Sequence, residues 1–316
     1  MIEAHQLHKQ FEAFTAVHEV SLNVAKGELL ALLGPNGAGK TTSIRMISSI
    51  LPPTSGWARI NGHDVVAQPD AVRRSIGMLT EQPGLYERMT SMEYLQFYGR
   101  LYGMNKSDIQ DKGLALLNRF NMPGTADRRL GDFSKGMKQK VGLIRAMLHN
   151  PAVLLLDEPT SAMDPHSAKL VRDAISEMRS DDRAVVLCTH NLPEAERLAD
   201  RIAIINAGRI VAKGTVAELK QQLLGAPTME LTLDRPLNGQ TEAFKELIAN
   251  GPEIEIETAA ANTIRYNTPD PIQTNPQLIR HLSGLGLGVV TLHEITRSLE
   301  EVYLSVVSEE KQETPS

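Results

Sequence analysis

One stretch constrains the fold of this chain more than any other. It runs from Gly34 to Thr42, reads GPNGAGKTT, and fits the pattern G-x-x-x-x-G-K-[ST]. The residues before it, Glu28–Leu33, contain a short apolar run of strand length. The residues after it, Lys40–Leu51, place apolar side chains at helical spacing until a Pro-Pro pair stops the helix. The sequence therefore predicts a strand, a glycine-rich turn and the start of a helix.

Such a turn can bind phosphate, because glycines allow backbone conformations in which several N–H groups converge on one anion. The N-terminus of the following helix adds partial positive charge at the same point. We expect Lys40 to reach the β- and γ-phosphates of a nucleotide and the Thr41 hydroxyl to bind Mg²⁺. The predicted nucleotide-binding residues of this stretch are Gly34, Pro35, Asn36, Gly37, Ala38, Gly39, Lys40, Thr41 and Thr42.

Two later apolar runs end in side chains that suit the same chemistry. Ala152–Leu156 has the length and composition of a strand buried on both faces of a parallel sheet, and it ends in Asp157 and Glu158. Beside a phosphate loop, Asp157 can hold Mg²⁺, and Glu158 is placed to orient or deprotonate the attacking water. A second buried strand, Ala184–Cys188, leads to His190, which can hydrogen-bond the γ-phosphate. A structural histidine is an equally good interpretation there.

Two further signals are weaker. Ser134 is the predicted N-cap of the helix before the Asp157 strand, so a second helix N-terminus presents a hydroxyl and free N–H groups. A capped surface helix with lysines is the plainer interpretation. Residues Ile2–Val24 predict two or three short strands with Phe11 and Phe14 in the loop between them. Phe11 would then lie near a stacking position for adenine, although ordinary packing explains it equally well.

Composition limits the classes of protein that fit. The 316 residues suffice for one large or two medium domains. The net charge of −5 argues against a general nucleic-acid surface. Cys188 is the only cysteine, which excludes an intrachain disulfide and a cysteine-based metal cluster and fits an intracellular location. No apolar run reaches the ~18–20 residues of a membrane span, so any membrane part must come from another polypeptide.

The order of predicted elements divides the chain. After a capping box at Thr90 and Glu93, helical pattern dominates to His149, which indicates a helical insertion over about residues 84–150. A Gly-Ala-Pro segment at Gly225 ends the first predicted domain, residues 1–225.

The remainder predicts a second, smaller domain. Residues 226–308 read as strand, helix, two strands, helix and strand, the order of a ferredoxin-like layer, with helices at Thr241–Ile248 and Pro276–Leu282. A closing helix begins at Ser298, and residues 309–316 are predicted to be a disordered tail.

Taken together, the motifs resemble those of the ATP-binding subunits of ABC transporters, over Ile2 to about Leu224. The motifs, in order, are Gly34–Thr42, Phe133–Gln139, Leu154–Glu158, Ser161–Asp164 and His190. The resemblance implies an α/β fold: a P-loop ABC-type ATPase domain with a mixed sheet core, an N-terminal β lobe and a helical insertion, followed by a small α+β C-terminal domain. It also implies ATP and Mg²⁺ as cofactors and ATP hydrolysis as the activity.

In that family, the glycine loop of one subunit faces the serine-containing signature of a second subunit, head to tail, and two ATP molecules are trapped between them. By resemblance, Ser134 and Gly136 would bind the partner's γ-phosphate, and Asp164 would lie at the dimer seam. The remaining implied roles are adenine stacking for Phe11, catalytic base for Glu158 and γ-phosphate sensor for His190.

The sequence departs from the family pattern at two places. The family signature is usually Leu-Ser-Gly-Gly-Gln, and here Lys135 replaces its first glycine and Met137 its glutamine. The family also has a glutamine after the strand predicted at Ser75–Leu79, where it reaches toward Mg²⁺ and the water. Alignment puts Glu81 at that place with Gln82 beside it, and the sequence leaves open which of them faces the nucleotide. An acid there would change the metal contact and favour slow hydrolysis.

Three segments look like one branch of this family, the bacterial exporters of drugs, antibiotics, sodium or glycan precursors. They are Phe133–Gln139, Gly84–Tyr86 and Ser298–Leu304. In that branch the ATPase is a chain separate from its permease. The resemblance therefore implies two partners, an integral membrane permease and a second copy or paralogous ATPase subunit, with no nucleic acid. It implies a place at the cytoplasmic face of the cell membrane, with about Gly84–Met92 receiving the permease's coupling helix.

A soluble ABC-type ATPase that acts on ribosomes or DNA is the alternative. The chain has one cassette, no heptad run and no basic stripe, which argues against it. A metabolite kinase with the same loop is a third hypothesis, and the signature and helical insertion argue against that one.

Overall fold

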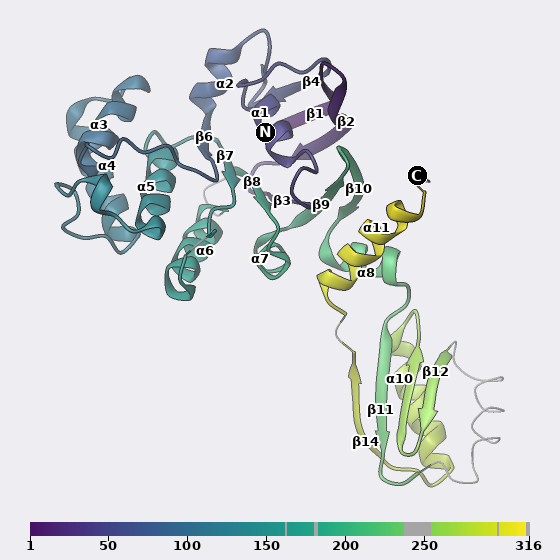
Figure 1. Ribbon diagram of the computed structural model, residues 1–316. Coiled ribbons are helices and arrows are strands. Elements are labelled where there is room, and N and C mark those ends of the chain that lie inside the picture. Colours follow the sequence, from purple (N-terminus) through teal and green to yellow (C-terminus); the bar gives the residue numbers. More distant parts are fainter. Residues whose placement is uncertain (162, 180–182, 237–253, 296, 314–316) are drawn as a thin grey trace. The chain divides into compact units, whose positions relative to one another are not determined.

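The chain forms two compact units. The computed structural model describes residues 1–316 except 162, 180–182, 237–253, 296 and 314–316. The first unit is Met1–Val216 and the second is Ala217–Ser316 (Figure 1). The division falls near the start of α8 (Val216–Leu224), earlier than the boundary predicted at Gly225.

The N-terminal lobe is a four-stranded antiparallel sheet in the order β2-β1-β4-β5. Its strands are β1 (Ile2–Phe11), β2 (Phe14–Val24), β4 (Ser55–Ile60) and β5 (His63–Asp64). The first two strands pair along their whole length, from Ile2 opposite Val24 to Phe11 opposite Phe14. Two strands agree with the predicted two or three, but they are longer than predicted. Phe11 and Phe14 end the strands at a two-residue turn and do not lie in a loop, so that part of the prediction is wrong.

A six-stranded mixed sheet forms the core of the first unit, in the order β10-β9-β3-β8-β7-β6. Its strands are β3 (Leu29–Leu33), β6 (Ile76–Leu79), β7 (Val153–Asp157), β8 (Ala184–Thr189), β9 (Arg201–Asn206) and β10 (Arg209–Gly214). All pairs are parallel except β9 with β10. Every residue of β3, β7 and β8 is buried, as expected for strands covered on both faces.

Alternate residues of these strands pack into two hydrophobic clusters. One cluster joins Leu155 and Val186 to the N-terminal lobe and to α1 (Lys40–Ile47). The other joins Leu154 and Val185 to the helices of the opposite face, among them α6 (Pro165–Arg179) and α7 (Leu192–Leu198). The carboxyl ends of the parallel strands are therefore held rigidly beside the start of α1.

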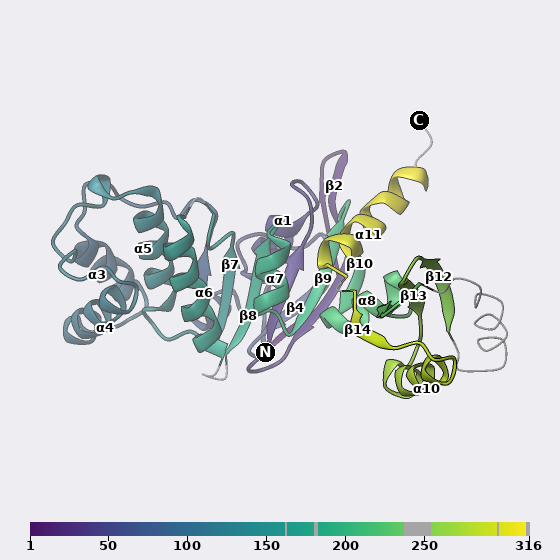
Figure 2. The ribbon, with the colours of Figure 1, turned by 90° about the horizontal axis from the view of Figure 1, so that it is seen from below.

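The helical insertion lies between β6 and β7, as predicted. It consists of α3 (Ser91–Leu101), α4 (Lys106–Arg119), the short 3₁₀ helix η1 (Leu130–Asp132) and α5 (Lys135–Met147), and Figure 2 shows its α-helices grouped at one end of the first unit. The predicted capping box is confirmed: the Glu93 amide donates to Thr90 Oγ1 at 3.2 Å, and the Thr90 amide donates to Glu93 Oε2 at 2.8 Å.

Two helices of the first unit differ from prediction. α1 ends at Ile47, not at Leu51, because the chain turns at Ser49, whose φ is +57°, before it reaches the prolines. An unpredicted helix, α2 (Pro69–Ser75), precedes β6, so Ser75 ends a helix and does not begin the strand. Its signal was present in the sequence, because proline at the first helical position followed by Asp70 is typical of a helix start.

The second unit contains a four-stranded antiparallel sheet in the order β12-β13-β11-β14, with β11 (Thr228–Leu233) between β13 and β14. The remaining elements are β12 (Glu255–Ala260), β13 (Thr263–Asn267), α10 (Pro271–Gly284), β14 (Val289–Glu294) and α11 (Leu299–Glu313). This strand order is that of a split βαβ layer. The helix predicted at Thr241–Ile248 lies outside the described residues.

Two helix ends in this unit also differ from prediction. α10 begins at Pro271, five positions before the predicted start at Pro276, because the Asp270 side chain caps it by accepting from the Gln273 amide at 3.1 Å. α11 continues to Glu313, into the segment predicted as a tail, where glutamate, lysine and glutamine favour helix.

Candidate functional site

The glycine loop joins β3 to α1 at the carboxyl end of the core sheet. Gly37 and Gly39 have φ of +84° and +103°, a region of backbone conformation that favours glycine. Gly39 is also in close contact with the lobe, since a Cβ there would lie 2.7 Å from the Ala16 carbonyl oxygen. The two glycines therefore set a loop shape that other residues would strain.

A hairpin supports this loop from the side. The amide of Gly208, in the turn between β9 and β10, donates to the Ala38 carbonyl at 2.9 Å, and its carbonyl accepts from the His18 amide at 2.7 Å. A Cβ on Gly34 would lie 2.2 Å from the Ile205 carbonyl oxygen, so β9 also packs directly on the start of the loop.

Lys40 is the first residue of α1 and is only 7% exposed. Its Nζ donates hydrogen bonds to the carbonyl oxygens of Gly34 at 2.6 Å and Pro35 at 3.1 Å. The loop's own carbonyls thus hold the ammonium over the loop. An ammonium has three donors, so it can make these two bonds and still contact an anion.

Thr41 and Asp157 meet at the edge of the sheet. Thr41 Oγ1 donates to Asp157 Oδ2 at 3.2 Å, and Asp157 is 5% exposed at the end of β7. Burial raises the pKa of the Asp157 carboxyl, and the Thr41 hydrogen bond partly offsets this. A hydroxyl and a carboxylate oxygen so close together form a donor set that fits Mg²⁺, which prefers oxygen ligands.

Glu158 and His190 form a pair beside them. The Glu158 Oε1 accepts from the His190 amide at 3.0 Å and lies 2.7 Å from His190 Nδ1. Glu158 has a φ of +51°, a left-handed conformation that is uncommon for a residue with a side chain. Its carbonyl accepts from the Gln139 side chain at 3.3 Å and from the Ser161 amide at 3.1 Å, which stabilises that conformation.

These groups surround one cavity of about 460 Å³. It is lined by Phe14, Ala16, Pro35, Asn36, Gly37, Ala38, Gly39, Lys40, Thr41, Thr42, Glu81, Asp157, Glu158, Ser161 and His190. The structure therefore brings together eight residues of the glycine loop, the two carboxylates of the Asp157 strand, and His190. Phe14, Ala16 and Ser161 were not predicted.

Six predicted residues lie outside the cavity lining, among them Gly34, whose carbonyl accepts from Lys40. Phe11 is 44% exposed with the Lys9 ammonium 5.2 Å from its ring centre, and Gln82 lines a neighbouring hollow with Lys135 and Lys138. Of the other three, Ser134 and Asp164 lie on an exposed surface and Gly136, beside Ser134, is half-buried.

That exposed surface includes the start of α5. Ser134 is its N-cap, as predicted, and Ser134 Oγ accepts from the Met137 amide at 3.2 Å. Met163 lies beside it, since a Cβ on Gly136 would be 3.7 Å from Met163 Cγ. Asp164 accepts from the amides of His166 and Ser167 at 3.1 and 3.0 Å, and these bonds lower the pKa of its carboxyl.

Comparison with known proteins identifies the family. The ABC transporter family model matches residues 17–161. The uncharacterized ABC transporter ATP-binding protein YxlF of Bacillus subtilis is 36% identical over 310 residues, covering 97% of this chain and 99% of that protein. The chain belongs to the ABC transporter family. It is an ATP-binding subunit that hydrolyses ATP, and the predicted class of enzyme is confirmed.

Other relatives of this ABC subunit agree in length and fold. The Nod factor export ATP-binding protein I of Rhizobium sp. is 33% identical over 302 residues, covering 96% of this chain and 95% of that protein. A solved structure of an ATP-binding subunit of an ABC transporter matches with a TM-score of 0.67 and 32% identity, over 71% of this chain and 94% of that one. The predicted fold class is thereby confirmed.

The described part of this ABC subunit offers neither a membrane-spanning helix nor a cluster of metal-binding side chains. No helix there is both long and apolar enough to cross a membrane. No group of three or more histidine, cysteine, aspartate or glutamate side chains is placed there to hold a metal ion.

Proposed function

We propose that this subunit hydrolyses Mg-ATP between two head-to-tail copies and so drives a separate membrane permease, outward. The observation that supports this proposal is the division of the site residues between two surfaces. The cavity contains the glycine loop, Asp157, Glu158 and His190, whereas Ser134 and Asp164 lie outside its lining on exposed surface. A triphosphate contacted by both sets requires two copies.

ATP binding is assigned to the glycine loop. Its backbone N–H groups and the N-terminus of α1 attract the phosphates, and Lys40 supplies a full positive charge there. Thr41 and Asp157 are the residues that would hold Mg²⁺, which when bound neutralises charge on the β- and γ-phosphates. Phe14 lines the cavity and Phe11 does not, so Phe14 is the better candidate for a contact with the base.

Water activation is assigned to Glu158. Its carboxylate lies in the cavity at the end of β7, and His190 holds it from one side through a backbone and a ring nitrogen. A carboxylate fixed in this way can accept a proton from a water that attacks the γ-phosphate, and the imidazole can contact the same phosphate. Glu81, from the loop after β6, also lines the cavity.

The second copy is proposed to close the site with its α5 N-terminus. Ser134 and Gly136 keep the hydroxyl and the close backbone approach that a γ-phosphate contact requires. Lys135 adds a positive charge where the family usually has glycine.

The proposed permease contact is an aromatic surface of the helical insertion. Tyr86 and Phe97 are 49% and 39% exposed, and their rings pack edge to face with centres 5.8 Å apart. A neighbouring hollow of about 330 Å³ is lined by Ile50, Tyr98 and Tyr102, among other residues. A short amphipathic helix from a membrane partner fits such a surface. The location that follows is the cytoplasmic face of the cell membrane.

Replacing Glu158 by Gln tests the proposal. The variant keeps the shape of the side chain but removes its basicity, so ATP should still bind while turnover falls by about 10²–10⁴-fold. Trapped ATP should then hold two copies together long enough to elute as a dimer in gel filtration with Mg-ATP. Glu196→Gln, an exposed change on α7, is the matched control and should behave as wild type. Normal hydrolysis by Glu158→Gln, or a variant that stays monomeric with Mg-ATP and the permease, would refute it.

A further inference from the structure

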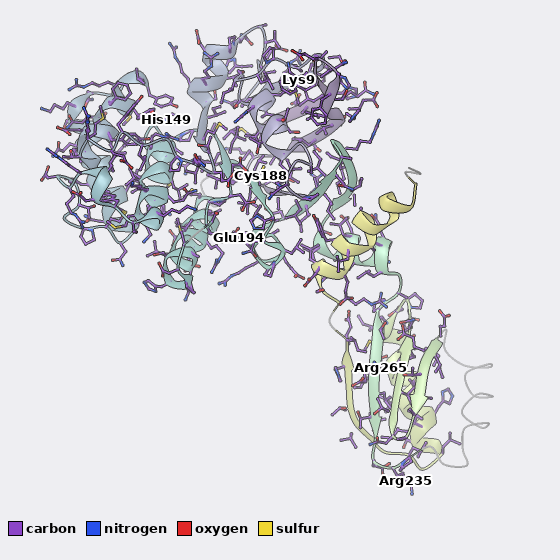
Figure 3. The ribbon with its side chains drawn as sticks, in the orientation of Figure 1. Lys9, His149, Cys188, Glu194, Arg235 and Arg265 are labelled. Carbon is purple, nitrogen blue, oxygen red and sulfur yellow. The ribbon has the colours of Figure 1, made fainter. Side chains whose placement is uncertain are left out.

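Glu194 is a buried carboxylate that lies beside the cavity without lining it. It is on α7 (Figure 3) and is 3% exposed. Its Oε1 accepts a hydrogen bond from Thr160 Oγ1 at 2.7 Å, and its Oε2 accepts one from Thr189 Oγ1 at 3.2 Å. The side chain thus gives one oxygen to the loop after β7 and the other to the last residue of β8, where the next loop begins.

These two loops carry Glu158 and His190. Thr160 is two residues after Glu158, and Thr189 directly precedes His190. On the cavity side, the loops are joined by the contact of 2.7 Å between Glu158 Oε1 and His190 Nδ1. Behind it, the bridge from Thr160 through Glu194 to Thr189 joins the same two loops a second time, through a side chain that a third element supplies.

The bridge is itself held firmly. Thr189 Oγ1 accepts from the Asn191 amide at 3.0 Å, and Asn191 Oδ1 accepts from the Glu194 amide at 3.1 Å and caps α7. Burial raises the pKa of the Glu194 carboxyl, and the two threonine hydroxyls and Arg172 partly offset this rise. A carboxylate out of water needs its hydrogen bonds, so loss of either threonine contact is costly and the geometry is strongly favoured.

We infer that Glu194 is a positioning residue for hydrolysis: by bridging Thr160 and Thr189, it sets the distance between Glu158 and His190. The inference rests on the catalytic role proposed for Glu158. A base displaced by even 1 Å from its water loses much of its effect, while phosphate binding by the glycine loop does not depend on this spacing. The bridge should therefore affect kcat and leave ATP binding unchanged.

A matched pair of variants at Thr160 isolates the bridge. Thr160→Val keeps the shape of the side chain and removes the hydroxyl, whereas Thr160→Ser keeps the hydroxyl. We expect Thr160→Val to lower kcat by about tenfold and Thr160→Ser by less than about twofold, with the ATP dissociation constant of both within about twofold of wild type. Both changes are small enough that thermal unfolding in the absence of nucleotide can confirm a folded protein.

Variants at Glu194 extend the test. Glu194→Ala should lower kcat by about ten- to a hundredfold, and Glu194→Gln by less, because the amide oxygen still accepts one hydroxyl. Glu196→Ala on the exposed side of the same helix is the control. The double variant Thr160→Val/Glu194→Ala should turn over no more slowly than Glu194→Ala alone, since the two residues act through one contact.

The outcomes separate two failures. If Thr160→Val hydrolyses ATP at the wild-type rate, or if the Thr160→Val and Thr160→Ser variants lose kcat equally, the bridge does not position Glu158 and the inference is overturned. If Glu158→Gln itself hydrolyses ATP normally, the proposed function fails first, whatever the Thr160 variants do. Equal losses in ATP affinity and kcat would point to a purely structural role for Glu194 and would also overturn the inference.

Discussion

The cavity and the surface around Ser134 and Asp164, called here the α5 surface, both present polar groups suited to bind phosphate. Those of the cavity are buried, and those of the α5 surface are exposed. In the cavity, Lys40 and Asp157 are 7% and 5% exposed and are hydrogen-bonded to neighbouring residues. On the α5 surface, Ser134 and Asp164 are exposed, and their hydrogen bonds serve mainly to cap the helices that begin there. Both surfaces present a helix N-terminus, yet one is enclosed by its own chain and the other faces outward.

This difference separates binding from turnover. An enclosed set of donors can bind an anion alone, because its groups are already desolvated and oriented. An exposed cap competes with water and gains strength only when another surface covers it. Variants of the two surfaces should therefore fail in different assays.

Lys40→Ala should weaken ATP binding most. It removes a charged hydrogen-bonding group worth ~1.5–3 kcal/mol, which corresponds to about ten- to a hundredfold in the dissociation constant. Equilibrium binding of a fluorescent ATP analogue to the nucleotide-free protein measures this directly. Lys169→Ala, an exposed lysine on α6, is the control. Unchanged affinity in Lys40→Ala would remove the glycine loop from the binding site and the contrast with it.

Ser134→Ala should spare ATP binding and slow turnover by about tenfold, because one hydrogen bond to a charged phosphate is lost only in the dimer. The loss of the phosphate contact must be separated from the loss of the helix cap, since losing an N-cap costs ~1 kcal/mol of stability. Asn105→Ala supplies the match: Asn105 caps α4 by accepting from the Asp108 amide at 2.8 Å. Its stability should fall by a similar amount while its kcat stays at the wild-type value. If Ser134→Ala and Asn105→Ala have the same kcat, the α5 surface takes no part in hydrolysis.

Asp157→Asn should stabilise the nucleotide-free, metal-free protein slightly. Burial raises the pKa of the Asp157 carboxyl, so folding disfavours its charged form and costs stability at neutral pH. Asparagine keeps the shape and the bond from Thr41 without the charge, and the melting temperature should rise by about 2–4 °C.

The stabilisation by Asp157→Asn should depend on pH. As pH falls through the raised pKa, wild-type Asp157 takes up its proton in the folded state and recovers the lost stability. The gap between the two proteins should therefore narrow toward about pH 4. Thermal unfolding with a metal chelator present measures both values, and exposed Asp173→Asn is the control. A lower melting temperature for Asp157→Asn at neutral pH would mean that the charged carboxylate is net stabilising.

The cavity residues that could be predicted from the sequence are those whose positions are fixed by the end of a strand. Asp157 and Glu158 follow an apolar run that could only be a buried strand, and His190 follows another. Parallel strands end at the same edge, so their next residues must meet there. The glycine loop was readable for a similar reason, because its required φ values leave few choices of residue.

Residues whose positions depend on turns and loops could not be predicted in this way. Phe11 and Phe14 are directly opposite each other across a two-residue turn, and nothing in the sequence says which one faces the cavity. Glu81 and Gln82 follow the end of β6, where the alternation of the strand no longer applies, and only the structure shows that Glu81 lines the cavity. Glu194 was missed because one of its two partners, Thr160, lies 34 residues away in the sequence, so no local pattern joins them.

The Gly208 turn carries a final consequence. Gly208 is hydrogen-bonded both to Ala38 and to His18, so the last hairpin of the first unit helps to fix the conformation of the phosphate loop. Gly208 has a φ of +78°, and a Cβ there would lie 2.9 Å from the Ala16 carbonyl oxygen. A side chain at this position would therefore displace the hairpin and distort the phosphate loop without contacting the nucleotide. A shortened polypeptide that keeps the whole GPNGAGKTT sequence but ends before this hairpin should therefore bind nucleotide weakly. Substitution of Gly208 should likewise weaken nucleotide binding, as a substitution within GPNGAGKTT would.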